Sequence, residues 1–244
     1  MIGVRRGLAA CLMGLVVVLA LLGVGPAGWV AGPACAVVLA VAAARRAAAD
    51  EVVRLGPADL VTLTRATLAC AVAALVAESY AGADAVAILV PITVVALSLD
   101  FVDGRVARRT GTATAYGARL DAESDAFLIL VLSVLVAGSH GAWVLAIGGV
   151  RYAYAVAAAL LPWMRRRLPP RYWRKVVAAY VGVALTLAAS GLAPAALAYG
   201  VLVVAIGLLA ESFGRDVVWL WRRRRLNRTD PGSVLTGKSL QRNR

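Results

Sequence analysis

Long apolar stretches separated by short polar connections run along most of the chain. They cover residues 8–24, 28–44, 60–77, 85–99, 126–138, 142–163, 176–190 and 193–212. A helix needs roughly 17–25 residues to span a bilayer, and the shorter stretches can gain a turn from their flanks. With 61% hydrophobic residues and a mean hydropathy of +0.81, the chain is more apolar than an ordinary soluble domain. The pattern predicts an all-α polytopic membrane protein with eight helices.

The basic residues are distributed unevenly over the connections between these stretches. If the amino terminus lies inside, the outer connections contain no Lys or Arg, and all 26 basic residues except Arg151 fall at inner helix ends or in the tail. This separation follows the positive-inside rule. We therefore expect a multi-pass protein of a bacterial cell membrane with both termini in the cytoplasm. The net charge of +13 suits anionic lipid headgroups, and no nucleic-acid partner is expected.

Three segments differ in composition. Residues 1–50 predict a helical hairpin, residues 51–215 contain six helices, and residues 216–244 lose the apolar pattern and predict a basic, disordered cytoplasmic tail. The first apolar stretch also resembles a signal peptide. However, a second apolar stretch follows at once and the intervening sequence is a poor cleavage site, so a retained hairpin is favoured.

Four aspartates lie at the inner ends of two apolar stretches. Asp100 and Asp103 are three residues apart, and Asp121 and Asp125 are four apart, so each pair shares one face of a helix. Carboxylates at membrane depth usually mark a functional site. Four hard oxygen ligands favour Mg²⁺ or Mn²⁺, and two such cations would neutralise them. The alternative is a set of loop salt bridges with nearby arginines, which does not explain two helical pairs with glycines at fixed offsets.

Three neighbouring residues point to a phosphate ligand. Gly104 directly follows Asp103 and lets a ligand approach the backbone. Arg108 lies on the same helical face and can pair with phosphate oxygens. Gly117 would leave room for a flat group or a neighbouring helix. Two metals with a carboxylate at their edge are suited to displacement at phosphorus, with the carboxylate accepting a proton from the attacking hydroxyl.

The ordered pattern D-x2-D-G-x2-A-R-x8-G-x3-D-x3-D, from Asp100 to Asp125, resembles the motif of the CDP-alcohol phosphotransferases. The resemblance implies a six-helix membrane core, a homodimer, two divalent cations, and displacement of CMP from a CDP-linked donor by an alcohol. The core would be residues 51–215, and the hairpin of residues 1–50 would be an addition to the family pattern.

The same resemblance implies roles for single residues. Asp100, Asp103 and Asp121 would hold the first metal and support the second, and Asp125 would be a ligand of the second metal and the general base. The residues that would receive the cytidine diphosphate are Gly104, Arg108 and Gly117.

An earlier segment resembles the start of the first core helix in many bacterial members, which read Pro-Asn-x-x-Thr-x-x-Arg. Here Thr62 and Arg65 keep the relative spacing, while Asp59 stands about where Asn is usual. Thr62 and Arg65 would face a phosphate near the cytoplasmic mouth. For Arg65, an interfacial anchor that extends its charge toward water is an equally good interpretation.

Arg151 lies within an apolar stretch, near the middle of the membrane by position. A charge at that depth normally faces a cavity or a partner. One interpretation is an acceptor pocket in which Arg151 binds an anionic headgroup. The other is an internal ion pair or a contact with backbone carbonyls.

These observations predict an enzyme that transfers a phosphatidyl group from CDP-diacylglycerol to a polar alcohol and releases CMP. Glycerol 3-phosphate is the preferred acceptor, as in phosphatidylglycerophosphate synthases, because several arginines are available for a phosphate. An inositol phosphate is the second choice. A metal-ion transporter and a catalytically silent scaffold are alternatives from other classes. The carboxylates lie at one end and the remaining spans show no further ladder of acidic residues, which disfavours the transporter, and the complete set of aspartates disfavours the scaffold.

Overall fold

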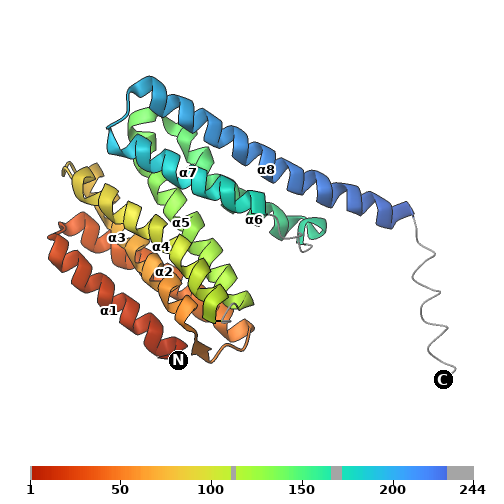
Figure 1. Ribbon diagram of the computed structural model, residues 1–244, viewed down its shortest axis with the longest axis horizontal. Helices are drawn as coiled ribbons and strands as arrows, with labels where there is room; N and C mark the ends of the chain where they lie inside the picture. The colour runs from red at the N-terminus through yellow and green to blue at the C-terminus, as the bar shows by residue number, and fades with distance from the viewer. Residues whose placement is uncertain (1, 111–113, 166–171, 230–244) are drawn as a thin grey trace.

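The computed structural model describes residues 2–110, 114–165 and 172–229, and it omits the side chains of residues 101–110, 165, 172 and 223–229. Within these ranges it contains eight α-helices, as the apolar pattern predicts (Figure 1). They are α1 (Val4–Leu22), α2 (Pro26–Ala49), α3 (Pro57–Tyr80), α4 (Val86–Thr110), α5 (Ala115–His140), α6 (Leu145–Leu160), α7 (Tyr172–Ser190) and α8 (Ala195–Thr229).

Short non-helical elements join these helices. Two short strands, β1 (Ile2–Gly3) and β2 (Arg54–Leu55), pair antiparallel and join the start of the chain to the segment before α3. Two 3₁₀ turns, η1 (Ala142–Val144) and η2 (Pro162–Arg165), flank α6.

The boundaries of the first helices follow from their terminal residues. Gly23 ends α1 with φ 61°, a left-handed conformation that glycine adopts without steric cost. Pro26 begins α2 and Pro57 begins α3, where proline's missing N–H has no helical partner to lose. Asp59, in the first turn of α3, accepts a hydrogen bond from the backbone N–H of Gly56 at 2.8 Å. These terminal residues therefore set where α1 ends and where α2 and α3 begin.

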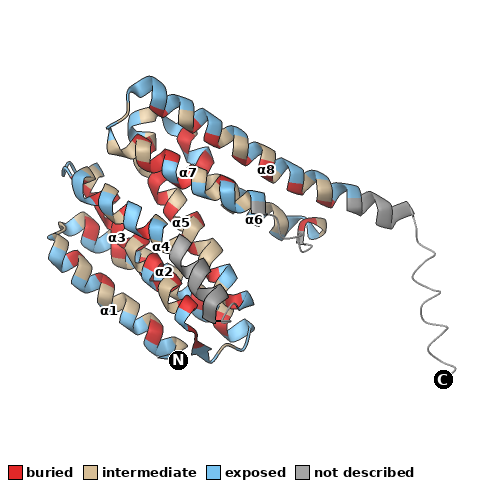
Figure 2. Cartoon of the chain, viewed as in Figure 1, coloured by how far each residue is buried: buried red, intermediate tan, exposed pale blue. Residues whose placement is uncertain are grey.

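Helix α3 is the centre of the amino-terminal half of the bundle. It packs against α1, α2, α4 and α5, and it is buried along most of its length (Figure 2). Helix α5 in turn packs against α6 and α7, and α7 packs against α8. Ala69, Ala71 and Ala74 of α3 are almost fully buried. Their small side chains let the neighbouring helices approach closely.

Five helical segments among the described residues are long and apolar enough to cross a membrane. They are Val4–Leu22, Pro26–Ala49, Pro57–Tyr80, Ala142–Leu160 and Ala195–Arg222, while the apolar part of α4, Val86–Asp100, is shorter. Many of their large apolar side chains face outward, among them Leu21, Val30 and Leu160. A lipid environment accommodates such a surface, whereas water does not. The protein is therefore an integral membrane protein.

The last helix continues beyond the last apolar stretch. Helix α8 extends past residue 215 to Thr229, and the predicted disordered tail stays a prediction because residues 230–244 lie outside the described residues. The first part of this extension packs against α7. Asp216 and Leu220 are buried, and Asp216 Oδ1 lies 2.8 Å from Arg174 Nη2 of α7.

Candidate active site

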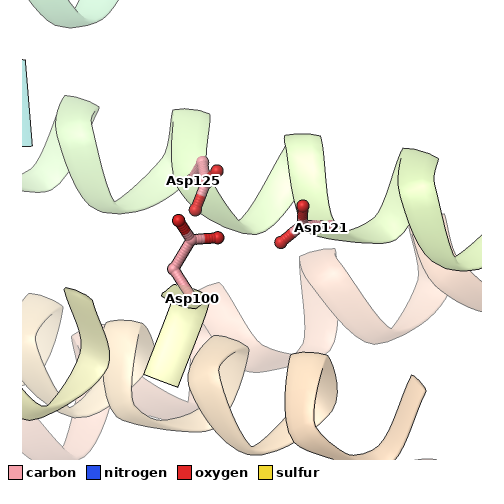
Figure 3. A group of neighbouring side chains, drawn as sticks. All are labelled: Asp100, Asp121 and Asp125. Atoms are coloured by element: carbon pink, nitrogen blue, oxygen red, sulfur yellow. The ribbon is translucent and has the colours of Figure 1, made fainter. Parts of the chain in front are cut away.

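Three of the four predicted metal-binding aspartates lie together. Asp100, near the end of the apolar part of α4, faces Asp121 and Asp125 in the first turns of α5, and the three carboxylates point toward one another (Figure 3). One oxygen from each side chain lies within 4.8 Å of the others. The spacing of four residues places Asp121 and Asp125 on the same face of α5, as expected. All three side chains are partly exposed.

Arg65 of α3 reaches into the same cluster. Its guanidinium Nη1 lies 3.0 Å from Asp100 Oδ1 and also contacts Asp121, while Nη2 contacts Asp125. Its Nε donates to the backbone carbonyl of Ala96 at 3.3 Å. The side chain is only 3% exposed. This burial does not fit the interpretation of Arg65 as an interfacial anchor, because its charge pairs with the aspartates instead of reaching water.

The other residues of the first α3 turns have local partners. Thr62 is buried, and its hydroxyl donates to the carbonyl of Ala58 at 3.2 Å. Asp59 is 2% exposed; one carboxylate oxygen accepts from the N–H of Gly56, and the other has no hydrogen-bond partner among the described residues. A Cβ added to Gly117 would lie 2.5 Å from that second oxygen. The missing side chain of Gly117 therefore lets α3 approach α5 closely, one of the two roles expected for this glycine. Its contact with a nucleotide stays a prediction.

Three predicted site residues fall on side chains outside the described set. Asp103, Gly104 and Arg108 lie on the last turns of α4 by their backbone. Their predicted roles toward a metal and a nucleotide diphosphate stay predictions.

The described cluster places three negative charges against the positive charge of Arg65. Three convergent carboxylates repel one another unless cations compensate them. An all-oxygen set of this kind suits Mg²⁺ or Mn²⁺, which prefer hard ligands. The three aspartates therefore fit a divalent cation by donor chemistry and by spacing.

Comparison with known proteins agrees with this chemistry. A family model described as CDP-alcohol phosphatidyltransferase matches residues 55–210, more than half of the chain. The chain belongs to the CDP-alcohol phosphatidyltransferase family. No curated protein and no solved structure was found to match it significantly.

The family match contains all four aspartates of the motif and Arg65. Membership supports transfer of a phosphatidyl group from a CDP-linked alcohol, and enzymes of this family generally depend on divalent metals. Helices α1 and α2 lie before the matched residues, and the interpretation of the hairpin as an addition to the family core stays a prediction.

Arg151 has a partner that the sequence pattern did not identify. Its Nη2 lies 3.8 Å from Oε2 of Glu123 on α5, and Nη1 of Arg46 on α2 lies 3.1 Å from the same oxygen. This geometry agrees with the ion-pair interpretation of Arg151, and its role in an acceptor pocket stays a prediction. The signal for Glu123 was its place between Asp121 and Asp125, on a different face of the helix.

Proposed function

We propose that this protein transfers a phosphatidyl group from CDP-diacylglycerol to a polar alcohol and releases CMP. The observation that carries the proposal is the convergence of three carboxylates and Arg65 at one end of α3, α4 and α5. Family membership supports the CDP-linked donor. A diacylglycerol donor suits the position of this cluster at the ends of apolar helices, because its acyl chains can stay in the bilayer while its phosphates reach the carboxylates.

The aspartates would hold two divalent cations, Mg²⁺ or Mn²⁺. Asp100 and Asp121, with Asp103, would serve the first, and Asp125 would serve the second. When bound, such cations neutralise the diphosphate and steady the attacking and leaving oxygens. Arg65, which contacts Asp100, Asp121 and Asp125 from α3, keeps these carboxylates oriented.

The reaction itself is a displacement at phosphorus. Asp125 accepts the proton of the acceptor hydroxyl, and the resulting oxygen attacks the phosphorus that carries the diacylglycerol. A new P–O bond to the acceptor forms, the bond between this phosphorus and the CMP oxygen breaks, and the electron pair leaves with CMP. Gly104, Arg108 and Gly117 would receive the cytidine diphosphate, with Thr62 beside them.

Glycerol 3-phosphate is the acceptor we propose, and an inositol phosphate is the second choice. The support is a cation at an intermediate depth, Arg151, beside Arg46 and Glu123, since an anionic acceptor needs a positive group near the reacting phosphorus. We further propose that the enzyme works as a homodimer, with its site and both termini on the cytoplasmic face of a bacterial cell membrane.

The test is a CMP-release assay on the purified full-length protein in lipid nanodiscs. CDP-diacylglycerol labelled in the cytidine is supplied with glycerol 3-phosphate, inositol 1-phosphate, serine or inositol in turn. We expect CMP release with Mg²⁺ or Mn²⁺, fastest with glycerol 3-phosphate, and none in EDTA. Release with a different acceptor would revise only the acceptor. If none of the four acceptors yields CMP, the proposed transferase activity is wrong.

A further inference from the structure

The first turns of α5 carry two different faces. Gly117, Asp121 and Asp125 face α3 and α4, where they meet Asp59, Arg65 and Asp100. The second face consists of residues spaced three or four apart, as expected for one side of a helix. These residues are Tyr116, Arg119, Leu120 and Glu123. All four contact or lie against the amino-terminal hairpin of α1 and α2 and the segment that links it to α3.

Two ion pairs connect this second face to the end of α2. Nη1 of Arg46 lies 3.1 Å from Oε2 of Glu123. Nη1 of Arg119 lies 2.9 Å from Oδ1 and 3.0 Å from Oδ2 of Asp50, so it contacts both oxygens of that carboxylate. The two pairs run in opposite senses, with the cation on α2 in one and on α5 in the other. They therefore define one register between the two helices.

A small apolar core lies between these ion pairs. Tyr116 and Leu120 of α5 are buried with Ala43 and Ala47 of α2 and with Leu55 and Leu63. Tyr116 is 2% exposed, and its hydroxyl lies 3.4 Å from the carbonyl oxygen of Ala43. This shared burial of apolar side chains opposes sliding or rotation of α5 against the hairpin.

The hairpin is attached to the segment just before α3 at one end and to α3 itself at the other. At the inner end, Ile2 pairs with Leu55 across the two short strands, and the N–H of Val4 donates to the carbonyl of Val53 at 3.3 Å. At the outer end, the N–H of Gly28 donates to Oε1 of Glu78 at 2.6 Å. The hairpin therefore links α5 to the helix that carries Arg65.

We propose that the amino-terminal hairpin positions α5 so that Asp121 and Asp125 are held opposite Asp100, with Arg46–Glu123 and Asp50–Arg119 as the positioning pairs. The inference rests on the proposed function in one respect, the binding of a divalent cation by these aspartates. Because Asp121 and Asp125 occupy the same helical turns as Arg119 and Glu123, a rotation of α5 that breaks the ion pairs also moves the carboxylates. Residues that orient metal ligands affect affinity by about 10–100-fold in metal sites generally.

Charge reversal gives a test whose sign separates positioning from simple electrostatics. Arg46→Glu adds negative charge near the cluster, which by Coulomb's law alone strengthens the binding of a cation. The positioning role predicts the opposite, a loss of Mn²⁺ affinity of roughly tenfold. The measurement is a titration of the purified full-length protein with Mn²⁺, followed by electron paramagnetic resonance of the free ion. Arg119→Glu makes the same prediction for the second pair.

Arg45 supplies the matched control. It is exposed one residue before Arg46, and among the described residues it has no ion pair, so Arg45→Glu carries the same charge change without breaking the contact. The swap Arg119→Glu with Asp50→Arg should restore affinity to within about twofold of the wild type, since this pair re-forms with its sense reversed.

The outcomes separate the positioning role from the proposed function. Mn²⁺ affinity in Arg46→Glu equal to or above that of Arg45→Glu would overturn the positioning role. A wild-type protein that binds no Mn²⁺ would instead overturn the metal site of the proposed function. Thermal melting checks that each variant is folded. If Arg46→Glu does not fold, Arg46→Gln is compared with Arg45→Gln. Removing a positive charge alone would again raise Mn²⁺ affinity, whereas loss of the positioning contact would lower it.

Discussion

Helix α3 carries a buried charge near each end, and the two surroundings differ. At one end, Glu78 accepts a 2.6 Å hydrogen bond from the N–H of Gly28. Its other oxygen packs so closely on Gly25 that an added Cβ there would lie 2.7 Å away. A single carboxylate thus meets the N-terminus of α2, where the helix dipole favours negative charge. The interaction is locally complete and joins the hairpin to α3.

At the other end, Arg65 meets three carboxylates from two other helices. Both charges are buried, so burial does not distinguish them. The difference is the number of carboxylates: among the described side chains, the single guanidinium of Arg65 faces three partly exposed aspartates. Such an excess of negative charge fits a divalent cation, whereas Glu78 meets backbone at the start of α2.

The largest expected effect comes from changing one carboxylate at each end. Asp125→Asn removes the proposed base and a metal ligand, so we expect CMP release to fall by about 10²–10⁴-fold. Glu78→Gln is the same chemical change at the other end of α3. It weakens one attachment of the hairpin but leaves the ion pairs between the hairpin and α5 intact, so the rate should fall by less than about tenfold. CMP release and thermal melting are measured on both variants.

Two outcomes would break this contrast. Near wild-type CMP release by Asp125→Asn would remove Asp125 from the chemistry. A Glu78→Gln variant that is folded but as inactive as Asp125→Asn would show that the end of α3 that carries Glu78 also takes part in catalysis.

A second prediction concerns Arg65. Arg65→Gln leaves three aspartates without this buried cation. Because the carboxylates are partly exposed, the cost should be below the about 3–5 kcal/mol of breaking a fully buried pair. A bound divalent cation stabilises the folded state by mass action, so Mg²⁺ should raise the melting temperature of this variant more than that of the wild type. The comparison is of melting curves in EDTA and in Mg²⁺.

Arg174→Gln is the control for Arg65. Nη2 of Arg174 lies 2.8 Å from Oδ1 of Asp216, and neither residue belongs to the three-aspartate cluster. This variant should lose stability without gaining extra stabilisation by Mg²⁺. If Mg²⁺ raises the melting temperature of Arg65→Gln no more than that of Arg174→Gln, Mg²⁺ does not replace the guanidinium of Arg65 among the aspartates.

The smallest effect concerns the approach of α5 to α3. Gly117→Ala would place a Cβ 2.5 Å from Asp59 Oδ1, and overpacking of this kind costs about 1–3 kcal/mol. Gly207→Ala, at a position with no atom within 4 Å of the added carbon, should cost nothing. Thermal melting measures both.

A double-mutant cycle sharpens this last prediction. Gly117→Ala should cost less in an Asp59→Ala background, because the opposing carboxylate is gone. An unchanged cost would mean that the close approach to Asp59 does not explain the glycine.

Local periodicity explains why much of this site could be predicted. Asp121 and Asp125 share a face because a helix places residues four apart on one side. The eight helices followed from runs of apolar residues, because a chain inside a bilayer must form helices to satisfy its backbone hydrogen bonds. The motif also pointed to the family before any geometry was known. These features depend on neighbours in the chain, so the sequence contains them directly.

Arg65 shows where such reasoning stopped. Its spacing from Thr62 suggested a phosphate contact or an anchor, yet its partners are Asp100, Asp121 and Asp125, distant in sequence. Glu123 was likewise missed, because its partner Arg46 lies on the hairpin, far away in the sequence. Both pairings depend on how helices pack, and no periodicity within one helix reports it.

The sequence by itself determined the membrane class, the helices, the family motif and the shared face of Asp121 and Asp125, because backbone hydrogen bonding and helical spacing are local. Only the tertiary structure decided that α3 inserts an arginine among the aspartates and that the hairpin contacts the same turns of α5. Those contacts join residues far apart in the chain, and they form because burying a charge requires partners that only the packing of several helices supplies.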